Sequence, residues 1–291
     1  MEIAGVNFRF KGELDPESFL RDQKAFDTFR STDVDDSLKT VEIELSFDPP
    51  PVNTSMLKIF DGDTAWQIFK DRNKYCFLYH PPSNRIPLWS AYFDISSSTV
   101  SVYLMEPPYD KNFFPYLTSL LRTLTMYMLF EENGLIVHGA GIDIDGCGII
   151  FSGKSGSGKS TISTVLNREN GHAVLSDERI VVHCDGREYS MSGTPWHSDA
   201  EFALNKSVKL SAICFIHHGA TSRVEPIDAK AALARLIPVA TIPWYDSALI
   251  QPMLDFCGKI VADIPVYDFW VKPDAAVAAF LSDLIKRLPD A

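Results

Sequence analysis

Short runs of alternating apolar and polar residues fill most of the first 110 positions of the chain. In residues 39–47 every second residue is apolar, which is typical of a strand with one buried face, and the Asp-Pro-Pro-Pro of residues 48–51 ends the run. Comparable runs, separated by turn-forming residues, occupy residues 57–60, 65–70, 75–79, 89–95 and 99–105. Strands at this spacing predict an antiparallel β-rich domain over residues 1–112, whose role the sequence does not indicate. An Asp-Pro start predicts one helix over residues 15–29.

The pattern changes near residue 111. Apolar residues recur at helical spacing over residues 113–132 and predict a mostly buried helix. Two apolar runs come next, residues 135–144 and 147–152, and the Asp145-Gly146 pair between them is typical of a tight β-hairpin. We therefore expect the second strand to pair antiparallel with its predecessor, unlike the first strand of a Rossmann unit. This pattern predicts a second domain over residues 113–291 and an α/β (α+β) fold class for the chain.

A glycine-rich loop after the hairpin matches the pattern GxxxxGK[ST]. It comprises Gly153, Lys154, Ser155, Gly156, Ser157, Gly158, Lys159 and Ser160. An apolar strand precedes it and a helix over residues 159–167 is expected after it, which is the context of a phosphate-binding loop. Glycines let backbone N–H groups surround phosphate oxygens, and the helix N-terminus favours an anion. We expect these residues and Thr161 to bind ATP, with Lys159 on the β- and γ-phosphates and Ser160 on Mg²⁺.

Two adjacent carboxylates, Asp177 and Glu178, come directly after the short apolar strand expected over residues 171–176. Neighbouring anions repel each other, so the pair suits a site that holds a metal ion or a proton in transit. The other interpretation is a solvated turn. His138, on the strand before the hairpin, is either a catalytic residue or a satisfied core histidine.

Other polar residues carry weaker signals. Residues 192–197, Ser-Gly-Thr-Pro-Trp-His, are expected to form an exposed loop that is either a lid over a substrate or a packing element. No metal site is expected at His217-His218, because neighbouring side chains on a strand point to opposite faces. Four arginines are candidates for stabilising transition-state charge, and the sequence does not choose among them: Arg179, Arg187, Arg223 and Arg235.

Charge and composition exclude several classes of protein. The 291 residues carry 27 basic and 38 acidic side chains, a formal charge of −11, so a general nucleic-acid binder is not expected. The N-terminus lacks the features of a signal peptide, and the most apolar stretch is too short to span a membrane. Five cysteines without a CxxC pair are typical of reduced thiols. We therefore expect a cytoplasmic protein that neither enters a membrane nor binds nucleic acid.

Together these motifs resemble the HPr kinase/phosphorylase family and its relatives with the PEP carboxykinase fold. In that family a His-Gly, a hairpin, a phosphate loop and a strand ending in Asp-Asp occur in this order, as His138-Gly139, residues 153–160 and Asp177-Glu178 do here. The resemblance covers residues 113–291. It implies that Asp177 acts as base toward the accepting hydroxyl, and that Ser160, Asp177 and Glu178 are the metal ligands.

The chain departs from the family in one motif. The Glu-Ile-Arg-Gly-Leu-Gly-like signature of the protein-kinase members does not occur downstream, and the SGTPW of residues 192–196 stands roughly in its place. In this respect the chain is more similar to kinase-like relatives encoded in bacterial peptide-modification clusters. HPr as substrate is therefore not implied, and neither is a phosphorylase reaction.

These residues predict an ATP-dependent phosphotransferase, with Lys159, Asp177 and His138 as catalytic residues and ATP and Mg²⁺ as cofactors. The expected acceptor is a serine of a protein or peptide, and a sugar or amino acid hydroxyl is the alternative. A nucleotide-binding sensor without catalysis is a third possibility, although simple binding does not require a base beside the phosphates. A homo-oligomer is compatible with the sequence.

Overall fold

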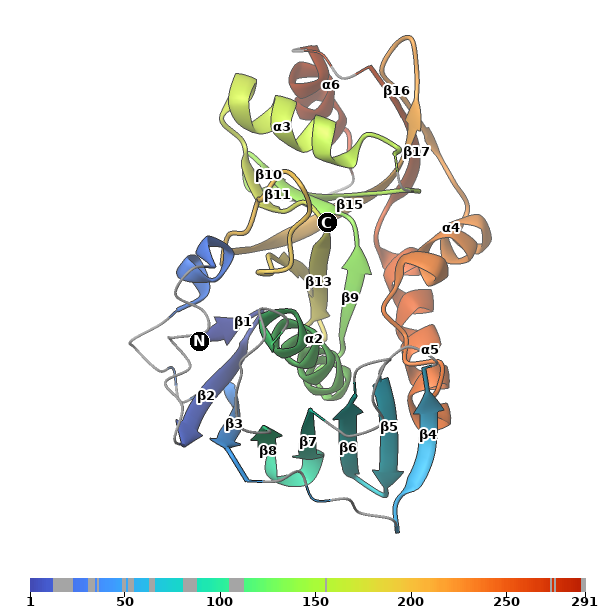
Figure 1. The fold of residues 1–291 in the computed structure, drawn as a ribbon. Coiled ribbons are helices and arrows are strands. Elements are labelled where there is room, and N and C mark those ends of the chain that lie inside the picture. Colours follow the sequence, from blue (N-terminus) through green and yellow to red (C-terminus); the bar gives the residue numbers. More distant parts are fainter. Residues whose placement is uncertain are drawn as a thin grey trace. The chain divides into compact units, whose positions relative to one another are not determined.

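The chain divides into two compact units, and Figure 1 shows their elements. Unit 1 comprises Met1–Lys24 and Arg30–Met128, and unit 2 comprises Ala25–Phe29 and Leu129–Ala291. The computed structural model describes residues 1–12, 23–30, 35, 37–48, 51, 55–62, 66–80, 88–104, 113–154, 156–272, 274 and 276–288.

Unit 1 contains an eight-stranded sheet of order β1-β2-β3-β8-β7-β6-β5-β4. Its elements are β1 (Glu2–Ile3), β2 (Val6–Gly12), β3 (Lys39–Ser46), β4 (Leu57–Asp61), β5 (Trp66–Asp71), β6 (Lys74–Tyr79), β7 (Trp89–Asp94), the short 3-10 helix η2 (Ile95–Ser97) and β8 (Thr99–Leu104). Alternation in residues 39–47 predicted β3 correctly, since Val41, Ile43 and Leu45 are fully buried. The expectation of an antiparallel sheet is wrong for three strands, because β3 pairs parallel with both β2 and β8.

The predicted helix over residues 113–132 is α2 (Phe113–Glu131). Most of it packs with unit 1: the ring of Tyr127 lies 4.5 Å from that of Tyr75 and within 6.2 Å of those of Phe77 and Phe93. The packing division therefore lies after Met128, whereas the sequence pattern predicts a boundary after residue 112. Aromatic contacts distant in sequence group the helix with the strands before it.

The helix predicted over residues 15–29 is largely untested, because residues 13–22 lie outside the described part of the chain. The next element is the 3-10 helix η1 (Lys24–Phe29), most of which is grouped with unit 2. Its Thr28 hydroxyl donates to the carbonyl oxygen of Ala203 and accepts from the amide of Asn205.

Unit 2 is built on a nine-stranded sheet with the main order β12-β10-β11-β15-β14-β13-β9, to which β17 and β16 are added beside β15. The strands are β9 (Gly134–His138), β10 (Ala140–Ile144), β11 (Cys147–Ser152), β12 (Ala173–Ser176), β13 (Arg179–Cys184), β14 (Tyr189–Ser192), β15 (Ser207–His218), β16 (Arg223–Pro226) and β17 (Val266–Val271). The helices are α3 (Lys159–Asn170), α4 (Ala229–Leu236), η3 (Ile237–Val239), α5 (Ser247–Asp263) and α6 (Ala276–Ile285).

The hairpin predicted at Asp145-Gly146 joins β10 and β11, which pair antiparallel. Both turn residues have positive φ angles, 54° and 88°, as a type I′ turn requires. The single strand expected over residues 135–144 is wrong: it is two strands, and β9 pairs with β13 while β10 pairs with β11 and β12. They separate at Gly139, whose amide donates to the carbonyl oxygen of Glu178, where a Cβ would lie 3.0 Å from the carbonyl oxygen of Phe151.

Strand direction brings several chain segments to one edge of the unit 2 sheet. Strands β11, β15 and β17 are parallel, and β12 runs with them because both β12 and β11 are antiparallel to β10. Helices α3 and α6 cover β10, β11 and β15 (Figure 1), and Phe151, Ile162 and Leu281 are fully buried in the core between them. The segments after β11, β12 and β15 therefore meet at the carboxyl edge, where ligands of such sheets bind.

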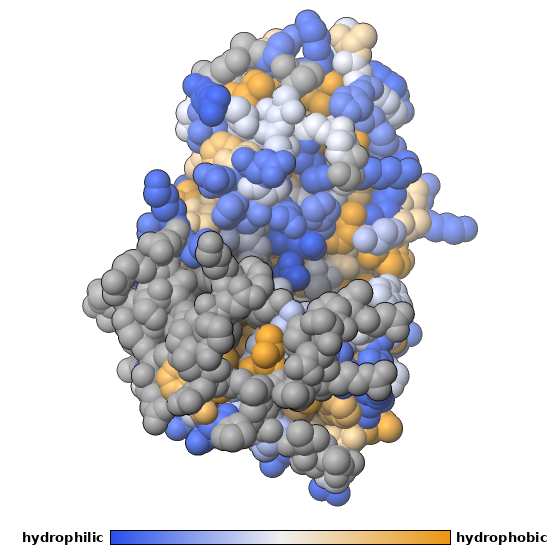
Figure 2. Space-filling view, viewed as in Figure 1, coloured by the Kyte–Doolittle hydropathy of each residue, from blue (hydrophilic) through white to orange (hydrophobic). Residues whose placement is uncertain are grey.

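Two further expectations concern the chain as a whole. All five cysteines are free thiols. Among the described helices, none combines the length and the apolar character needed to cross a bilayer. Figure 2 shows hydrophilic residues around small hydrophobic patches on the described part of one face.

Candidate functional site

The phosphate-loop sequence connects the last residue of β11, Ser152, to the first residue of α3, Lys159. Gly156 and Gly158 have φ angles of 77° and 99°, a left-handed conformation that favours glycine, and Gly158 is the N-cap of α3. A Cβ on Gly153 would lie 2.8 Å from the hydroxyl oxygen of Ser157. Ser155 lies outside the described residues. The strand, tight loop and helix N-terminus thus form the arrangement that the motif predicted.

Lys159 lies against the loop and is only 8% exposed. Its Nζ donates to the carbonyl oxygens of Gly153 at 2.9 Å and Lys154 at 3.3 Å. Burial lowers the pKa of this ammonium group from its usual value, and the nearby carboxylate of Glu178 opposes that shift. Carbonyl groups of the loop therefore hold the Lys159 ammonium group. An anionic ligand would replace these carbonyl groups as the hydrogen-bond partners of Lys159.

Asp177 comes directly after β12 and is buried, at 1% exposure. Its Oδ1 accepts a hydrogen bond from the amide of Ser198 at 3.0 Å, and its Oδ2 accepts from the Ser198 hydroxyl at 2.5 Å and from the amide of Ala200 at 3.1 Å. The Ser198 hydroxyl also lies 3.3 Å from that of Ser160, the first-turn serine of α3. One serine thus links the predicted carboxylate to the predicted metal-binding hydroxyl, and it is a residue that sequence reasoning missed.

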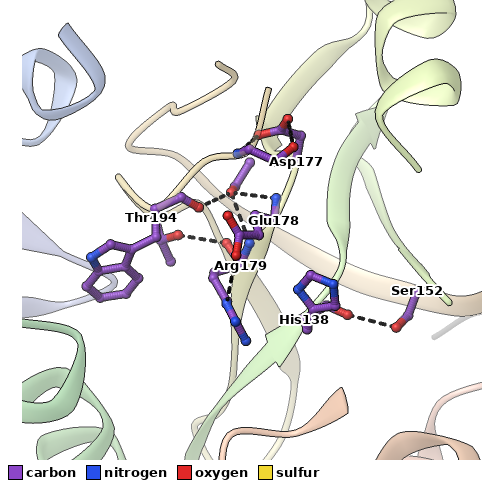
Figure 3. Close-up of polar contacts among 9 residues, drawn as sticks. His138, Ser152, Asp177, Glu178, Arg179 and Thr194 are labelled. Atoms are coloured by element: carbon purple, nitrogen blue, oxygen red, sulfur yellow. Dashed lines mark hydrogen bonds and ion pairs between the residues drawn. The ribbon is translucent and has the colours of Figure 1, made fainter. Parts of the chain in front are cut away.

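The second carboxylate of the predicted pair has different partners (Figure 3). Glu178 Oε1 lies 3.5 Å from the Nε of Arg179, and the backbone carbonyl oxygen of Glu178 accepts from the amide of Gly139 at 2.9 Å. Both the Glu178 and Arg179 amides donate to the Ser176 hydroxyl at 3.3 Å. The two carboxylates thus have different partners: residues 198–200 donate to Asp177, whereas Glu178 pairs with Arg179 and its charge acts on Lys159.

His138 ends β9 on the other side of the loop. Its carbonyl oxygen accepts from the Ser152 hydroxyl at 2.8 Å, while its buried Nδ1 has no hydrogen-bond partner within the described residues (Figure 3). Burial, followed by the charges of Arg179 and Lys159, lowers the pKa of the imidazole below its usual value of 6.5. The lowered pKa favours the neutral imidazole, and its buried Nδ1 is a polar atom still to be satisfied.

A cavity of about 860 Å³ opens beside the loop within unit 2. Its walls come from the loop and His138 on one side and from β15, α4 and η3 on the other: Gly153, Lys154, Gly156, Ser157, Phe215, Ile216, His217, His218, Ala234, Arg235, Pro238 and Val239. Buried Asp268 on β17 binds both His217, at 2.6 Å, and Arg235. His218 is 3.0 Å from the carbonyl oxygen of Gly156. Sequence reasoning missed this cluster because its members come from β15, α4 and β17.

The four arginines that are candidates for stabilising transition-state charge have different surroundings in the structure. Arg179 lies beside Glu178 and His138, and Arg235 lines the cavity. Arg223 stacks on the ring of Trp270, 3.6 Å from its centre, and pairs with Glu225. Arg187 is exposed in the turn between β13 and β14. Arg179 and Arg235 therefore lie beside residues of the candidate site, and Arg223 reaches it through Trp270, which stacks on the cavity-lining His217.

The expectation that residues 192–197 form an exposed loop is wrong. Ser192 to Trp196 are buried, and Trp196 is 7% exposed. The Thr194 hydroxyl donates to the carbonyl oxygen of Arg179 and the carbonyl of Trp196 accepts from Ser176, so this segment is fixed against the strand end that carries Asp177. It acts as packing, and the part that reaches the site is the turn after it, residues 198–200.

The described residues contain no group of three His, Cys, Asp or Glu side chains able to hold a metal ion by themselves. Ser160 and Asp177 nevertheless supply a hydroxyl and a carboxylate oxygen on either side of Ser198, and oxygen donors of this kind suit Mg²⁺, which keeps several waters and uses one or two protein carboxylates. The residues present therefore fit a magnesium ion carried by a nucleotide. His217 binds Asp268 and His218 lies against the loop at Gly156, and both histidines line the cavity.

Comparisons with known proteins concern the part of the chain that contains this site. A family described as "SynChlorMet cassette protein ScmC" matches residues 116–254, a range that contains the phosphate loop and Asp177. The HPr kinase/phosphorylase of Pelodictyon phaeoclathratiforme is 35% identical over 77 residues, 24% of this chain and 23% of that protein. Its counterpart from Chlorobaculum tepidum is 38% identical over 77 residues, 24% of this chain and 22% of that protein. The chain thus matches less than a quarter of the length of either relative.

A solved structure, the Hpr(Ser) kinase/phosphatase from Coxiella burnetii, aligns at 13% identity with a TM-score of 0.30, covering 52% of this chain and 93% of that chain. The sequence matches lie in the C-terminal part of the chain. This part is therefore related to HPr kinase/phosphorylases, which confirms the resemblance predicted from its motifs.

Proposed function

We propose that unit 2 is an ATP-dependent kinase that transfers the γ-phosphoryl group to a hydroxyl, with a serine of a protein or peptide as the acceptor. The observation that carries the proposal is the approach of a buried carboxylate, Asp177, and a phosphate loop, through Ser160, to the same seryl hydroxyl. A nucleotide-binding protein without transfer activity has no need of a buried carboxylate hydrogen-bonded to a hydroxyl. Relatives named HPr kinase/phosphorylase support kinase chemistry.

Each residue has a role that its place suggests. Lys159 and the loop amides bind the phosphates, and the Lys159 ammonium exchanges its carbonyl partners for phosphate oxygens. Ser160 and Asp177 would hold a Mg²⁺ ion, which supplies neutralisation of phosphate charge when bound. Asp177 accepts the proton of an acceptor hydroxyl that takes the place of the Ser198 hydroxyl. The proposed contribution of such a base is about 10²–10⁴-fold in rate.

Residues on the cavity side bind and orient the substrates. Neutral His138 offers a hydrogen bond, Arg235 offers positive charge, and Phe215 with Pro238 and Val239 offers apolar surface. Arg235, which lines the cavity, and Arg179, whose charge acts on His138, are the arginines that we propose stabilise charge developing on the transferred group. Glu178, paired with Arg179, orients that guanidinium rather than holding the metal ion.

A small-molecule acceptor is the second candidate, and the cavity favours it. Its volume of about 860 Å³ lies within the range of pockets that enclose drug-sized ligands, and its lining combines apolar walls with a few polar groups. A sugar or amino acid bound there would lie beside the loop, and its hydroxyl would have to reach past the cavity lining to Asp177, which is not part of that lining.

The test begins with the full-length chain and Mg²⁺·ATP. We expect Lys159→Ala to weaken nucleotide binding, measured by calorimetry, by at least about tenfold, because a charge-assisted contact to phosphate is lost. Lys209→Ala is the matched control, since Lys209 pairs with Glu188 on the surface of the same unit. Labelled phosphate is then tracked from ATP to serine peptides, sugars and amino acids. Equal nucleotide affinity in Lys159→Ala and wild type would contradict the proposed function.

A further inference from the structure

The Ser198 hydroxyl occupies the place that an acceptor hydroxyl would take. It donates to Asp177 Oδ2 at 2.5 Å and lies 3.3 Å from the hydroxyl of Ser160 on the phosphate-loop helix. A nucleophilic hydroxyl is activated when a general base stands within about 2.6–3.2 Å of it. Ser198 therefore has, within the chain itself, the relation to Asp177 that the proposed function requires of a substrate.

Access to Asp177 is limited to this segment of the chain. Asp177 is 1% exposed, and within the described part of the chain its three hydrogen-bond donors come from residues 198–200. Among the described residues, Ser198 is the one whose hydroxyl donates to this carboxylate. The amides of Ser198 and Ala200 also donate to Asp177 and so hold the turn against it. The Ser198 hydroxyl is therefore already oriented toward the carboxylate, and little conformational entropy is lost when it reacts.

Other serines near the loop have different partners. The Ser152 hydroxyl donates to the carbonyl oxygen of His138, and that of Ser163 to the carbonyl oxygen of Lys159. The Ser176 hydroxyl binds the carbonyl oxygen of Trp196. None of these three contacts a carboxylate, so the geometry distinguishes Ser198 from them.

We propose that the protein phosphorylates its own Ser198 in an intramolecular reaction, an inference that rests on the proposed kinase function. The Ser198 oxygen forms a bond to the γ-phosphorus of ATP, and the bond from that phosphorus to the oxygen bridging the β- and γ-phosphates breaks. ADP leaves with the electron pair of that bond, and the serine proton passes to Asp177 and then to water. ATP is the only co-reactant.

The product has a physical consequence for the site. A phosphoserine adds about −1.5 to −2 charges, and at residue 198 these charges would lie beside the carboxylate of Asp177. Repulsion between them moves residues 198–200 away from Asp177, which ends transfer to this serine after a single event and leaves the carboxylate open to another hydroxyl. One phosphate per chain is therefore the expected limit.

The experiment uses the full chain with Mg²⁺ and γ-labelled ATP and no added acceptor. We expect label to rise toward one phosphate per chain, peptide mass spectrometry to locate it on Ser198, and the rate per chain to be independent of protein concentration. Ser198→Ala abolishes the label, whereas Ser207→Ala, which removes a hydroxyl bonded to Ser192 elsewhere in the unit, leaves it unchanged. Ser198→Thr keeps a hydroxyl, so phosphothreonine should replace phosphoserine even if the alanine variant fails to fold.

Several outcomes overturn the inference. The first is that Ser198→Ala takes up label on another residue at the wild-type rate. The second is a labelling rate per chain that rises with protein concentration. The third is release of free phosphate without any label on the protein. If the chain binds Mg²⁺·ATP in a Lys159-dependent manner yet residue 198 stays unmodified, self-phosphorylation is wrong and the kinase proposal stands. If Lys159-dependent binding is itself missing, the kinase proposal fails.

Discussion

Ser152, the last residue of β11, donates a hydrogen bond from its hydroxyl to the carbonyl oxygen of His138, the last residue of β9, at 2.8 Å. The serine side chain is fully buried. This bond joins the strand that begins the phosphate loop to the strand that carries the candidate histidine, although the two strands are not neighbours in the sheet. The positions of His138 and the loop therefore depend on each other.

Ser152→Ala tests this link through stability. We expect the free energy of unfolding to fall by about 1–3 kcal/mol, because a buried carbonyl loses its partner. Urea denaturation measures the change. Ser222→Ala, at a more exposed hydroxyl that accepts from the amide of Lys272, should change it by less than about 0.5 kcal/mol. Equal effects of the two substitutions would contradict a structural role for the Ser152–His138 bond.

Asp177→Asn separates binding from transfer. The amide keeps the shape of the side chain but is a poor proton acceptor, so the rate of phosphate transfer should fall by about 10²–10⁴-fold. Nucleotide affinity without Mg²⁺ should change little, because Asp177 does not contact Lys159 in the structure. Filter-binding with labelled ATP and a transfer assay measure both quantities. Transfer at the wild-type rate would show that Asp177 is not the base.

His138 should make stability depend on pH. Its folded-state pKa lies below its usual value of 6.5, so the unfolded chain binds the proton more readily. The contribution of neutral His138 to the free energy of unfolding is fully present above pH 6.5. It is lost as the pH falls through the lowered pKa of the folded state. Wild type should therefore lose more stability than His138→Gln between pH 8 and about pH 5.5. His217, whose pKa is also lowered, is present in both proteins and cancels in the comparison. If the free energies of unfolding of wild type and His138→Gln changed equally with pH, the lowered pKa of His138 would be refuted.

Gly193→Ala tests the packing of the segment before Ser198. A Cβ at this position would lie 2.1 Å from the carbonyl oxygen of Leu204 and 2.7 Å from that of Leu175, so backbone must shift. We expect a loss of stability of about 1–3 kcal/mol or more, together with slower transfer, because Leu175 precedes Asp177 by two residues. The matched control is Gly258→Ala in α5, where a Cβ meets nothing within 4 Å and helix propensity predicts a gain of up to about 1 kcal/mol. Thermal unfolding distinguishes the two.

Local patterns in the sequence determined the elements that depend on near neighbours. Alternation predicted β3, helical periodicity predicted α2, and Asp145-Gly146 predicted the hairpin, because side-chain period and turn conformation are properties of adjacent residues. The phosphate loop was predicted for the same reason, since its glycines and Lys159 are close together in sequence and the strand and helix around it can be recognised from sequence.

Tertiary structure decided which groups meet at that loop. Asp177 is capped by a turn that begins 21 residues later, Asp268 joins His217 to Arg235 across three elements, and α2 packs with the strands before it. The alternation of apolar and polar residues likewise did not predict that β3 pairs parallel with β2 and β8. Such contacts are hydrogen bonds and packing between segments far apart in the chain. A single sequence determines the polarity and periodicity of each segment but not its partners, so the strand and helix around the loop could be predicted and the groups that surround the loop could not.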